Sequence, residues 1–302
     1  MPARRGLTLT GNELFNILVG GDGVDTLNGL GGNDELYGLG GADHLAGGEG
    51  DDVYYVDAAD VVMEVAGQGF DKVMADANFT LAAGVEVEWL QADVDTGLTL
   101  AGNGLANILI GGAGIDTLNG GGGADTLNGL GGADILAGGA GDDVYYVGAS
   151  DIVTELAGQG FDKVLASENY TLANGTDVEW LEANAGSTGL SLTGNNLTNS
   201  IVGGAGADTL NGGGGVDYLF GGAGGDSFAF NLGQANNDTV VDFSAGDHLD
   251  FFGYGAGATL TQIGATDAYL VTPDAAHGGV SGAEVIHITN VFGLNTADYL
   301  FH

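Results

Sequence analysis

Large apolar residues recur every nine residues in three blocks of the chain, at 20–55, 111–146 and 203–229. Eleven nonapeptides share one pattern, with Gly at positions one and four, Asp at position six and the apolar residue at position eight. In the first of them, GGDGVDTLN, the apolar residue is Leu27. The residues around position eight predict a short strand with one inward side chain, and the six before it predict a turn. The pattern therefore predicts an all-β repeat protein.

A longer repeat encloses these blocks. Leu7–Gly21, Leu98–Gly112 and Leu190–Gly204 align with one another and start 91 and then 92 residues apart. The chain therefore begins with a tail at 1–6. Two super-repeats follow, at 7–97 with nonapeptides at 20–55 and at 98–189 with nonapeptides at 111–146. A third block at 190–229 and a C-terminal segment at 230–302 complete the chain.

The charge of the chain is strongly unbalanced. Asp and Glu number 41 against 4 Lys and Arg, which gives a formal net charge of −37 at pH 7. This charge excludes nucleic acid as a partner, and it must be neutralised before a compact fold can form. The chain has no Cys, so disulfides and thiol chemistry are excluded.

No segment is suited to crossing a membrane. No stretch reaches the roughly 18 apolar residues of a membrane span. The six N-terminal residues contain no apolar run after their arginines. We therefore expect neither a cleaved signal peptide nor a transmembrane anchor.

The nonapeptide turns carry the groups that bind a hard cation. Gly at positions one and four lets backbone carbonyls approach a ligand, and Asp at position six adds a carboxylate. Donor sets made only of oxygen, in flexible turns, favour calcium over magnesium and over softer metals. The predicted carboxylate ligands are Asp25, Asp34, Asp43, Asp52, Asp116, Asp125, Asp134, Asp143, Asp208, Asp217 and Asp226. The predicted carbonyl ligands belong to Gly20, Gly29, Gly38, Gly111, Gly120, Gly129, Gly203 and Gly212.

The motif resembles the GGxGxDxUx signature of the RTX (repeats-in-toxin) calcium-binding family over residues 11–229. The resemblance implies a right-handed parallel β-roll or β-solenoid in which two nonapeptides make one turn. It also implies that each calcium ion lies between carboxylates two repeats apart. The implied pairs are Asp25 with Asp43, Asp34 with Asp52, Asp116 with Asp134, Asp125 with Asp143, and Asp208 with Asp226.

Three degenerate nonapeptides, at 11–19, 102–110 and 194–202, have Asn where Asp belongs. An amide oxygen can coordinate calcium but brings no negative charge. Asn16, Asn107 and Asn199 are therefore predicted to form weaker sites, and the alternative is that they only cap their turns.

The spacers at 56–97 and 147–189 match each other but lack the glycine period. Short β-branched and aromatic runs between Gly, Asn and Asp predict strands, so we expect the spacers to continue the solenoid without calcium. Trp89 and Trp180 stand at matching positions. We expect both in the core, and a sugar-stacking role is the alternative.

The glycine period ends at Phe230, and residues 238–251 resemble the closing region of RTX rolls. This resemblance implies that residues 230–302 form a C-terminal β cap. Asp242, Asp247 and Asp250 are candidates for a further calcium site there, although a solvated turn would also explain them. Residues 294–302 resemble the uncleaved secretion signal of type I substrates, with the type I machinery as the implied partner.

No HExxH or GxSxG motif occurs in the sequence, so we expect a non-enzyme. The hypothesis is a secreted extracellular or cell-surface protein that stays unfolded in a low-calcium cytosol and folds when calcium binds outside the cell. Its leading role is structural, as a matrix or S-layer-like protein able to form a homo-oligomer, filament or lattice through an open N-terminal β edge. The alternatives are a monomeric calcium-binding and secretion module of an extracellular protease, lipase or epimerase, and a surface adhesin.

Overall fold

Each nonapeptide forms a turn followed by a strand whose position-eight side chain points inward. A computed structural model of the protein describes residues 6–235, 237–275, 283–289 and 294–302. Leu27, Leu36, Leu45 and Tyr54 are all 0% exposed, as are their counterparts in the other two blocks. The predicted inward side chain of each nonapeptide is confirmed.

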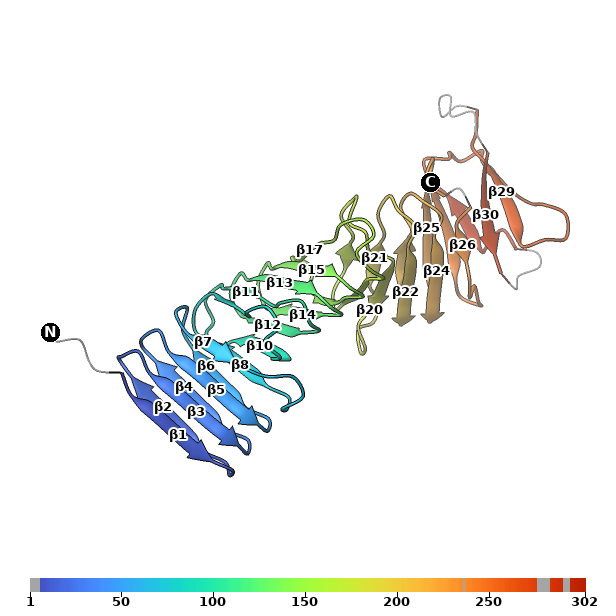
Figure 1. The fold of residues 1–302 in the computed structure, drawn as a ribbon. Coiled ribbons are helices and arrows are strands. Elements are labelled where there is room, and N and C mark those ends of the chain that lie inside the picture. The colour runs from blue at the N-terminus through green and yellow to red at the C-terminus, as the bar shows by residue number, and fades with distance from the viewer. Residues whose placement is uncertain (1–5, 236, 276–282, 290–293) are drawn as a thin grey trace. The chain divides into compact units, whose positions relative to one another are not determined.

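The chain divides into two compact units, which we describe separately: residues 1–146 with 150–154, and residues 147–149 with 155–302 (Figure 1). Residues 1–5 of the predicted tail lie outside the described residues. The strands of the first unit are β1 (Thr8–Asn12), β2 (Ile17–Gly21), β3 (Thr26–Gly31), β4 (Glu35–Leu39), β5 (His44–Glu49), β6 (Val53–Val56), β7 (Val61–Met63), β8 (Lys72–Ala75), β9 (Phe79–Thr80), β10 (Trp89–Ala92), β11 (Thr99–Ala101), β12 (Ile108–Gly112), β13 (Thr117–Gly122), β14 (Thr126–Leu130), β15 (Ile135–Ala140), β16 (Val144–Val147) and β17 (Ile152–Thr154).

Successive strands of the first unit alternate between opposite walls and pair in parallel with the strand one turn away. Leu27 lies opposite Leu45 and Leu36 lies opposite Tyr54, so two nonapeptides complete one turn. One wall is β2-β4-β6-β8-β10-β12-β14-β16. The other is interrupted between β7 and β9 and consists of two sheets, β1-β3-β5-β7 and β9-β11-β13-β15-β17. The predicted parallel β-solenoid is confirmed.

The second unit begins with the same architecture. Its strands are β18 (Lys163–Ala166), β19 (Tyr170–Thr171), β20 (Trp180–Ala183), β21 (Ser191–Thr193), β22 (Ser200–Ala205), β23 (Thr209–Asn211), β24 (Tyr218–Ala223), β25 (Ser227–Asn231), β26 (Thr239–Val240), β27 (His248–Phe252), β28 (Thr259–Gln262), β29 (Ala268–Thr272), β30 (Glu284–Ile288) and β31 (Tyr299–Phe301). The described residues contain no helix, and thus none of the length and hydropathy that crossing a membrane requires.

Parallel pairing gives way to antiparallel pairing at the C-terminal end. β30 still pairs in parallel with β26, but β29 and β28 follow it in antiparallel order, and β31 pairs with β27. A cap function for these strands stays a prediction.

The spacers extend the solenoid with turns of altered length. In the first spacer, Val73 lies opposite both Tyr54 and Leu90, so the wall runs on through β8 and β10. The expectation that the tryptophans lie in the core is wrong. Trp89 and Trp180 are half-buried on the outer face, and Leu90 and Leu181 point inward instead. Adjacent residues of a strand face opposite sides, so only one of each neighbouring pair can enter the core.

Position two of several nonapeptides has a left-handed backbone, which favours glycine. Leu30, Leu39 and Leu130 nevertheless occupy it, with φ of 81°, 69° and 67°. Leu130 is 58% exposed, so little packing offsets the strain. We expect Leu130→Gly to stabilise the calcium-loaded protein by up to about 1 kcal/mol, seen as a higher thermal midpoint. A lower midpoint would show that the leucine side chain contributes more by packing than its backbone costs.

Candidate calcium-binding rows

The predicted motif carboxylates form rows inside the solenoid. All eleven motif Asp residues are at most 1% exposed. Along a row, the backbone N–H of one aspartate donates to the carboxylate of the aspartate one turn on. Asp25 N donates to Asp43 Oδ1 at 2.6 Å, and Asp125 N donates to Asp143 Oδ1 at 2.7 Å. Every carboxylate pair implied by the family resemblance is brought together in this way.

Most of these carboxylates use only one oxygen in hydrogen bonds. The second oxygen is buried and has no hydrogen-bond partner. This group comprises Oδ2 of Asp34, Asp43, Asp52, Asp125, Asp134, Asp208, Asp217 and Asp226. A buried carboxylate oxygen without a donor is costly, so each one marks a place where a cation would stabilise the fold.

The position-one glycines leave room beside these oxygens. A Cβ on Gly203 would lie 2.8 Å from both Asp208 Oδ2 and the carbonyl oxygen of Gly221. A Cβ on Gly120 would clash with Asp125 Oδ2 and would lie 2.7 Å from the carbonyl oxygen of Gly138. A carboxylate and a carbonyl thus converge on space that only glycine leaves open. This donor set fits calcium, which coordinates carboxylate and carbonyl oxygens in flexible geometry.

Burial makes the rows electrostatically unfavourable without a cation. It raises the pKa of Asp52 to about 6 and the pKa values of Asp125 and Asp217 to about 7. The two lysines do not neutralise the negative charge of the rows. The ammonium groups of Lys72 and Lys163 lie over the rings of Trp89 and Trp180 on the outer face, at 4.8 and 5.4 Å from the ring centroids.

The three asparagines stand in line with the rows but make additional hydrogen bonds. Asn107 Oδ1 accepts from Asn103 N at 2.9 Å, and its Nδ2 donates to the carbonyl of Val87 at 2.8 Å. Asn199 makes the equivalent bonds, with Asn195 N and the carbonyl of Val178. Asn16, which is half-buried, donates to Phe15 O. The two buried amides therefore tie the first turn of a block to the preceding spacer.

An aspartate cannot donate the bond that Asn107 makes. We expect Asn107→Asp to destabilise the protein by about 1–3 kcal/mol at fixed calcium, because a carboxylate would face the carbonyl of Val87. Asn119→Asp, at an exposed position of the same block, is the matched control. Thermal unfolding measures both. A variant as stable as the control would instead favour a calcium ion between residue 107 and Asp125.

The rows continue past the nonapeptides through residues that the motif does not identify. Asp43 N donates to Asp60 Oδ1 and Asp52 N to Asp71 Oδ1, both at 2.9 Å. Asp217, which has no motif partner after it, donates from its N–H to Asp238 Oδ1 at 2.9 Å. A sequence signal existed for the first two, since Asp60 and Asp71 recur 91 residues later as Asp151 and Asp162.

The three C-terminal candidates have different surroundings. Asp247 extends a row, since its Oδ1 accepts from Asp226 N at 2.9 Å. Asp242 accepts from the backbone N–H groups of Gly221 and Gly222, at 2.8 and 2.9 Å. Asp250 lies outside the rows, where it accepts from Ser227 Oγ and lies 3.0 Å from His302 Nε2.

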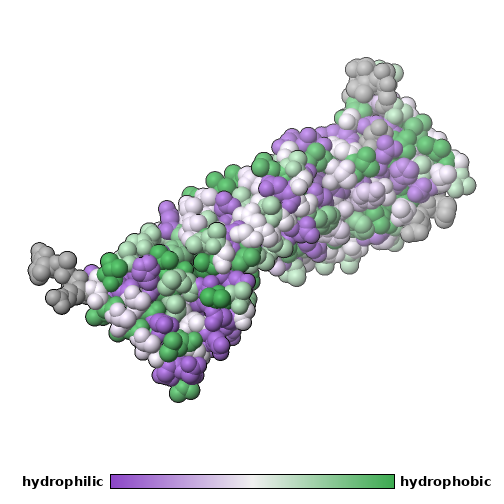
Figure 2. Space-filling view, viewed as in Figure 1, coloured by the Kyte–Doolittle hydropathy of each residue, from purple (hydrophilic) through white to green (hydrophobic). Residues whose placement is uncertain are grey.

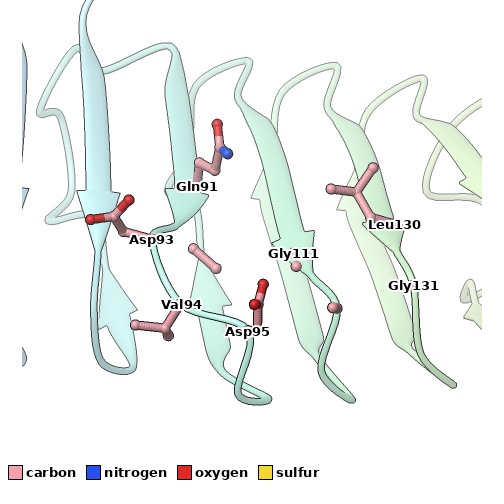
Figure 3. Close-up of a pocket in the computed structure, with 10 residues that line it drawn as sticks. Gln91, Asp93, Val94, Asp95, Gly111, Leu130 and Gly131 are labelled. Atoms are coloured by element: carbon pink, nitrogen blue, oxygen red, sulfur yellow. The ribbon is translucent and has the colours of Figure 1, made fainter.

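An open groove of about 450 Å³ lies on the outer face near β10, β12 and β14 (Figure 3). Its polar side chains are those of Gln91, Asp93 and Asp95. These carboxylate and amide groups are of the kind that bind cations or hydroxyl groups.

Comparison with known protein families identifies the same nonapeptide blocks. The family model described as "RTX calcium-binding nonapeptide repeat" matches four times, at residues 10–55, 101–136, 123–151 and 193–228. Such repeats bind several calcium ions in a β-roll without catalytic groups. No curated protein matches the chain.

Among solved structures, the chain is similar to the extracellular lipase LipA from Serratia marcescens. The two are 19% identical, with a TM-score of 0.32, over 76% of this chain and 45% of the lipase chain. The chain therefore spans less than half the length of that enzyme.

Proposed function

Since the chain is an RTX repeat protein, we propose that it is a secreted calcium-binding protein that folds outside the cell when calcium enters its carboxylate rows. The observation that carries this proposal is the set of buried carboxylate oxygens without hydrogen-bond donors. At a formal charge of −37, the chain repels itself until divalent cations neutralise the rows. We therefore expect the chain to be exported unfolded and to fold when it meets calcium outside the cell.

The ligands in this proposal are the motif aspartates and the carbonyl groups of the position-one glycines. Asp60, Asp71, Asp238 and Asp247 extend the same rows and are added to the predicted set. Asp242 remains a candidate through its place beside Gly221. Asp250 is not a proposed ligand, because its carboxylate accepts a hydrogen bond from Ser227 and pairs with His302.

For the folded protein we propose a structural role that depends on self-assembly. β1 and β2 each have one neighbour among the described strands, β3 and β4. Large apolar side chains are exposed on this first turn, Leu14 at 71% and Phe15 at 58%. Figure 2 shows hydrophobic residues at this end of the first unit. Edge strands and exposed apolar side chains together form a surface that a second copy of the chain can cover.

A surface adhesin is the second candidate, because aromatic side chains lie on one outer wall. The rings of Tyr37 and Tyr55 stack with centroids 4.2 Å apart and 4° between their planes. Trp89 is half-buried on the same wall. Flat aromatic surfaces of this kind suit stacking against sugar rings. No catalytic step is part of either proposal.

Particle mass measured by light scattering during a calcium titration tests the structural role. We expect calcium to produce large, ordered particles from the unaltered chain. Ile17→Lys, on the exposed edge strand β2, should leave a calcium-bound monomer, whereas the matched change Ile115→Lys at an exposed turn should still assemble. A compact monomer from the unaltered chain would instead support the adhesin or the monomeric module.

A further inference from the structure

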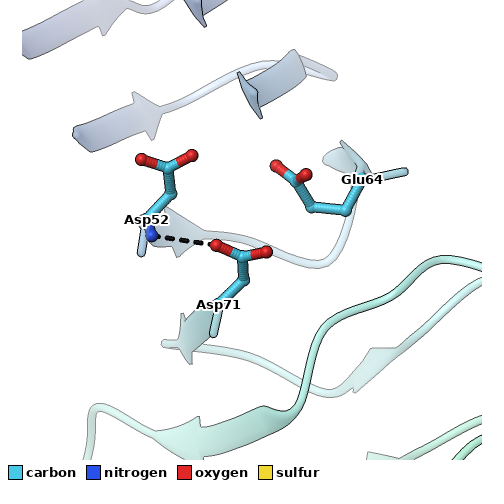
Figure 4. A group of neighbouring side chains, drawn as sticks. All are labelled: Asp52, Glu64 and Asp71. Carbon is cyan, nitrogen blue, oxygen red and sulfur yellow. Dashed lines mark hydrogen bonds between the residues drawn. The ribbon is translucent and has the colours of Figure 1, made fainter. Parts of the chain in front are cut away.

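Three buried acids meet where the first nonapeptide block joins its spacer. Asp52 belongs to the last nonapeptide, Glu64 follows β7, and Asp71 precedes β8. Their exposed fractions are 0%, 7% and 2%. Each offers one carboxylate oxygen, and the three oxygens lie within 4.8 Å of one another (Figure 4).

The two carboxylate oxygens of Glu64 differ in their hydrogen bonding. Its Oε1 accepts from the Gly47 N–H at 3.1 Å and from the Tyr54 hydroxyl, which in turn accepts from Gly47 N at 2.7 Å. Its Oε2 is buried and has no hydrogen-bond partner, and the same holds for Asp52 Oδ2. Two carboxylates of this buried cluster therefore each have one oxygen without a hydrogen-bond partner.

The geometry of this cluster suits a calcium ion. Ligand oxygens lie about 2.3–2.6 Å from bound calcium, so two oxygens of one site are at most about 5 Å apart. Three carboxylates bring three negative charges, and oxygen-only donors select a hard cation. The nearest lysine in sequence, Lys72, directs its ammonium group over the Trp89 ring instead.

We propose that Asp52, Glu64 and Asp71 form a calcium site that the nonapeptide motif does not encode. The proposal rests on the calcium-dependent function above, and it extends calcium binding into a spacer. The ion would join the last nonapeptide to both ends of the loop at residues 64–71. That loop carries Val65 and Phe70, which are 67% and 49% exposed. Calcium would thus order an apolar loop at the block boundary as well as the roll itself.

Native mass spectrometry of the full chain with calcium alone tests this site. Glu64→Gln keeps the oxygen that accepts from Gly47 and Tyr54 but removes the charge. Asp71→Asn likewise keeps an acceptor for Asp52 N. We expect each variant to bind one calcium ion fewer than the unaltered chain. Glu49→Gln changes an exposed position of the nonapeptide that contains Asp52, and this variant should bind the full number of calcium ions.

Hydrogen exchange provides a second readout on the variants that fold. The amides of residues 64–71 should exchange at least tenfold faster in Glu64→Gln than in Glu49→Gln, since loss of a direct ligand weakens metal binding by at least the roughly tenfold typical of indirect changes. Equal calcium counts and equal exchange in the two variants would overturn the proposed site while leaving calcium binding by the nonapeptides intact. An unaltered chain that binds no calcium would overturn both proposals.

Discussion

In calcium-free buffer, the folded protein is expected to lose stability as the pH rises from mildly acidic to neutral. Burial raises the pKa values of Asp71, Asp125, Asp217 and Asp238 to about 7. In the unfolded chain an Asp releases its proton near pH 4. Between these values the folded state holds protons that the unfolded state has released, so the free energy of unfolding falls with rising pH.

Calcium should reverse the sign of this dependence. The ion binds only the ionised carboxylates, so protons compete with it, and the calcium-loaded protein should gain stability over the same pH range. Circular dichroism of protein stripped by a chelating resin, recorded from mildly acidic to neutral pH, measures the first dependence, and thermal unfolding with added calcium measures the second. Calcium-free protein that becomes more stable toward neutral pH would contradict the account.

A matched pair of variants separates the buried charges from general repulsion. Asp125→Asn removes a buried charge but keeps an acceptor for the N–H of Asn107, so the calcium-free protein should keep its β structure to a higher pH. Asp76→Asn removes one charge at an exposed position and should have a much smaller effect. If the two variants changed stability equally, the pH dependence would come from net charge alone.

Gly203→Ala is expected to abolish one calcium site and to destabilise the third block. The new Cβ would lie 2.8 Å from Asp208 Oδ2 and from the carbonyl of Gly221, and the carbonyl cannot move without disturbing the strand. The clash alone should cost about 1–3 kcal/mol. Gly203 does not have positive φ, so backbone strain does not account for the effect.

The control for this change is Gly214→Ala in the same block. A Cβ there would meet only a backbone carbon at 3.7 Å, an ordinary contact. We expect the calcium midpoint of Gly203→Ala to rise by at least about tenfold, as for loss of a metal-binding group, and that of Gly214→Ala to stay unchanged. Both midpoints come from calcium titrations followed by circular dichroism. Equal midpoints would show that the space beside Gly203 is not part of a calcium site.

The sequence predicts the fold and the motif rows because both depend on one local period. Each nonapeptide places Asp at position six and an apolar residue at position eight, and parallel stacking superposes residues 18 apart. The pairing of Asp25 with Asp43 and the burial of Leu27 follow directly from that spacing.

The extensions of the rows were missed because the turn length changes where the motif ends. Asp60 follows Asp43 by 17 residues, Asp71 follows Asp52 by 19, and Asp238 follows Asp217 by 21. A search in steps of nine finds none of them. The nonapeptide spacing does not identify Glu64 for a further reason. Its side chain comes close to Asp52 from a loop and not from the corresponding position of a strand.

The outward tryptophans could not be assigned from composition. Trp89 is followed by Leu90, and either side chain is apolar enough to fill the core. The register decides between them, because Leu90 lies opposite Val73 and Leu109 in the inward line. The larger ring is left on the outer face, where Gln91 Oε1 accepts from its indole N–H at 3.1 Å.

Circular dichroism of the calcium-stripped chain at neutral pH, followed during a calcium titration, tests calcium-triggered folding most directly. The account predicts little ordered structure in excess chelator and a cooperative change to a β spectrum as calcium is added. Removal of the calcium should reverse the change. A full β spectrum in excess chelator, unaltered by calcium, would contradict it.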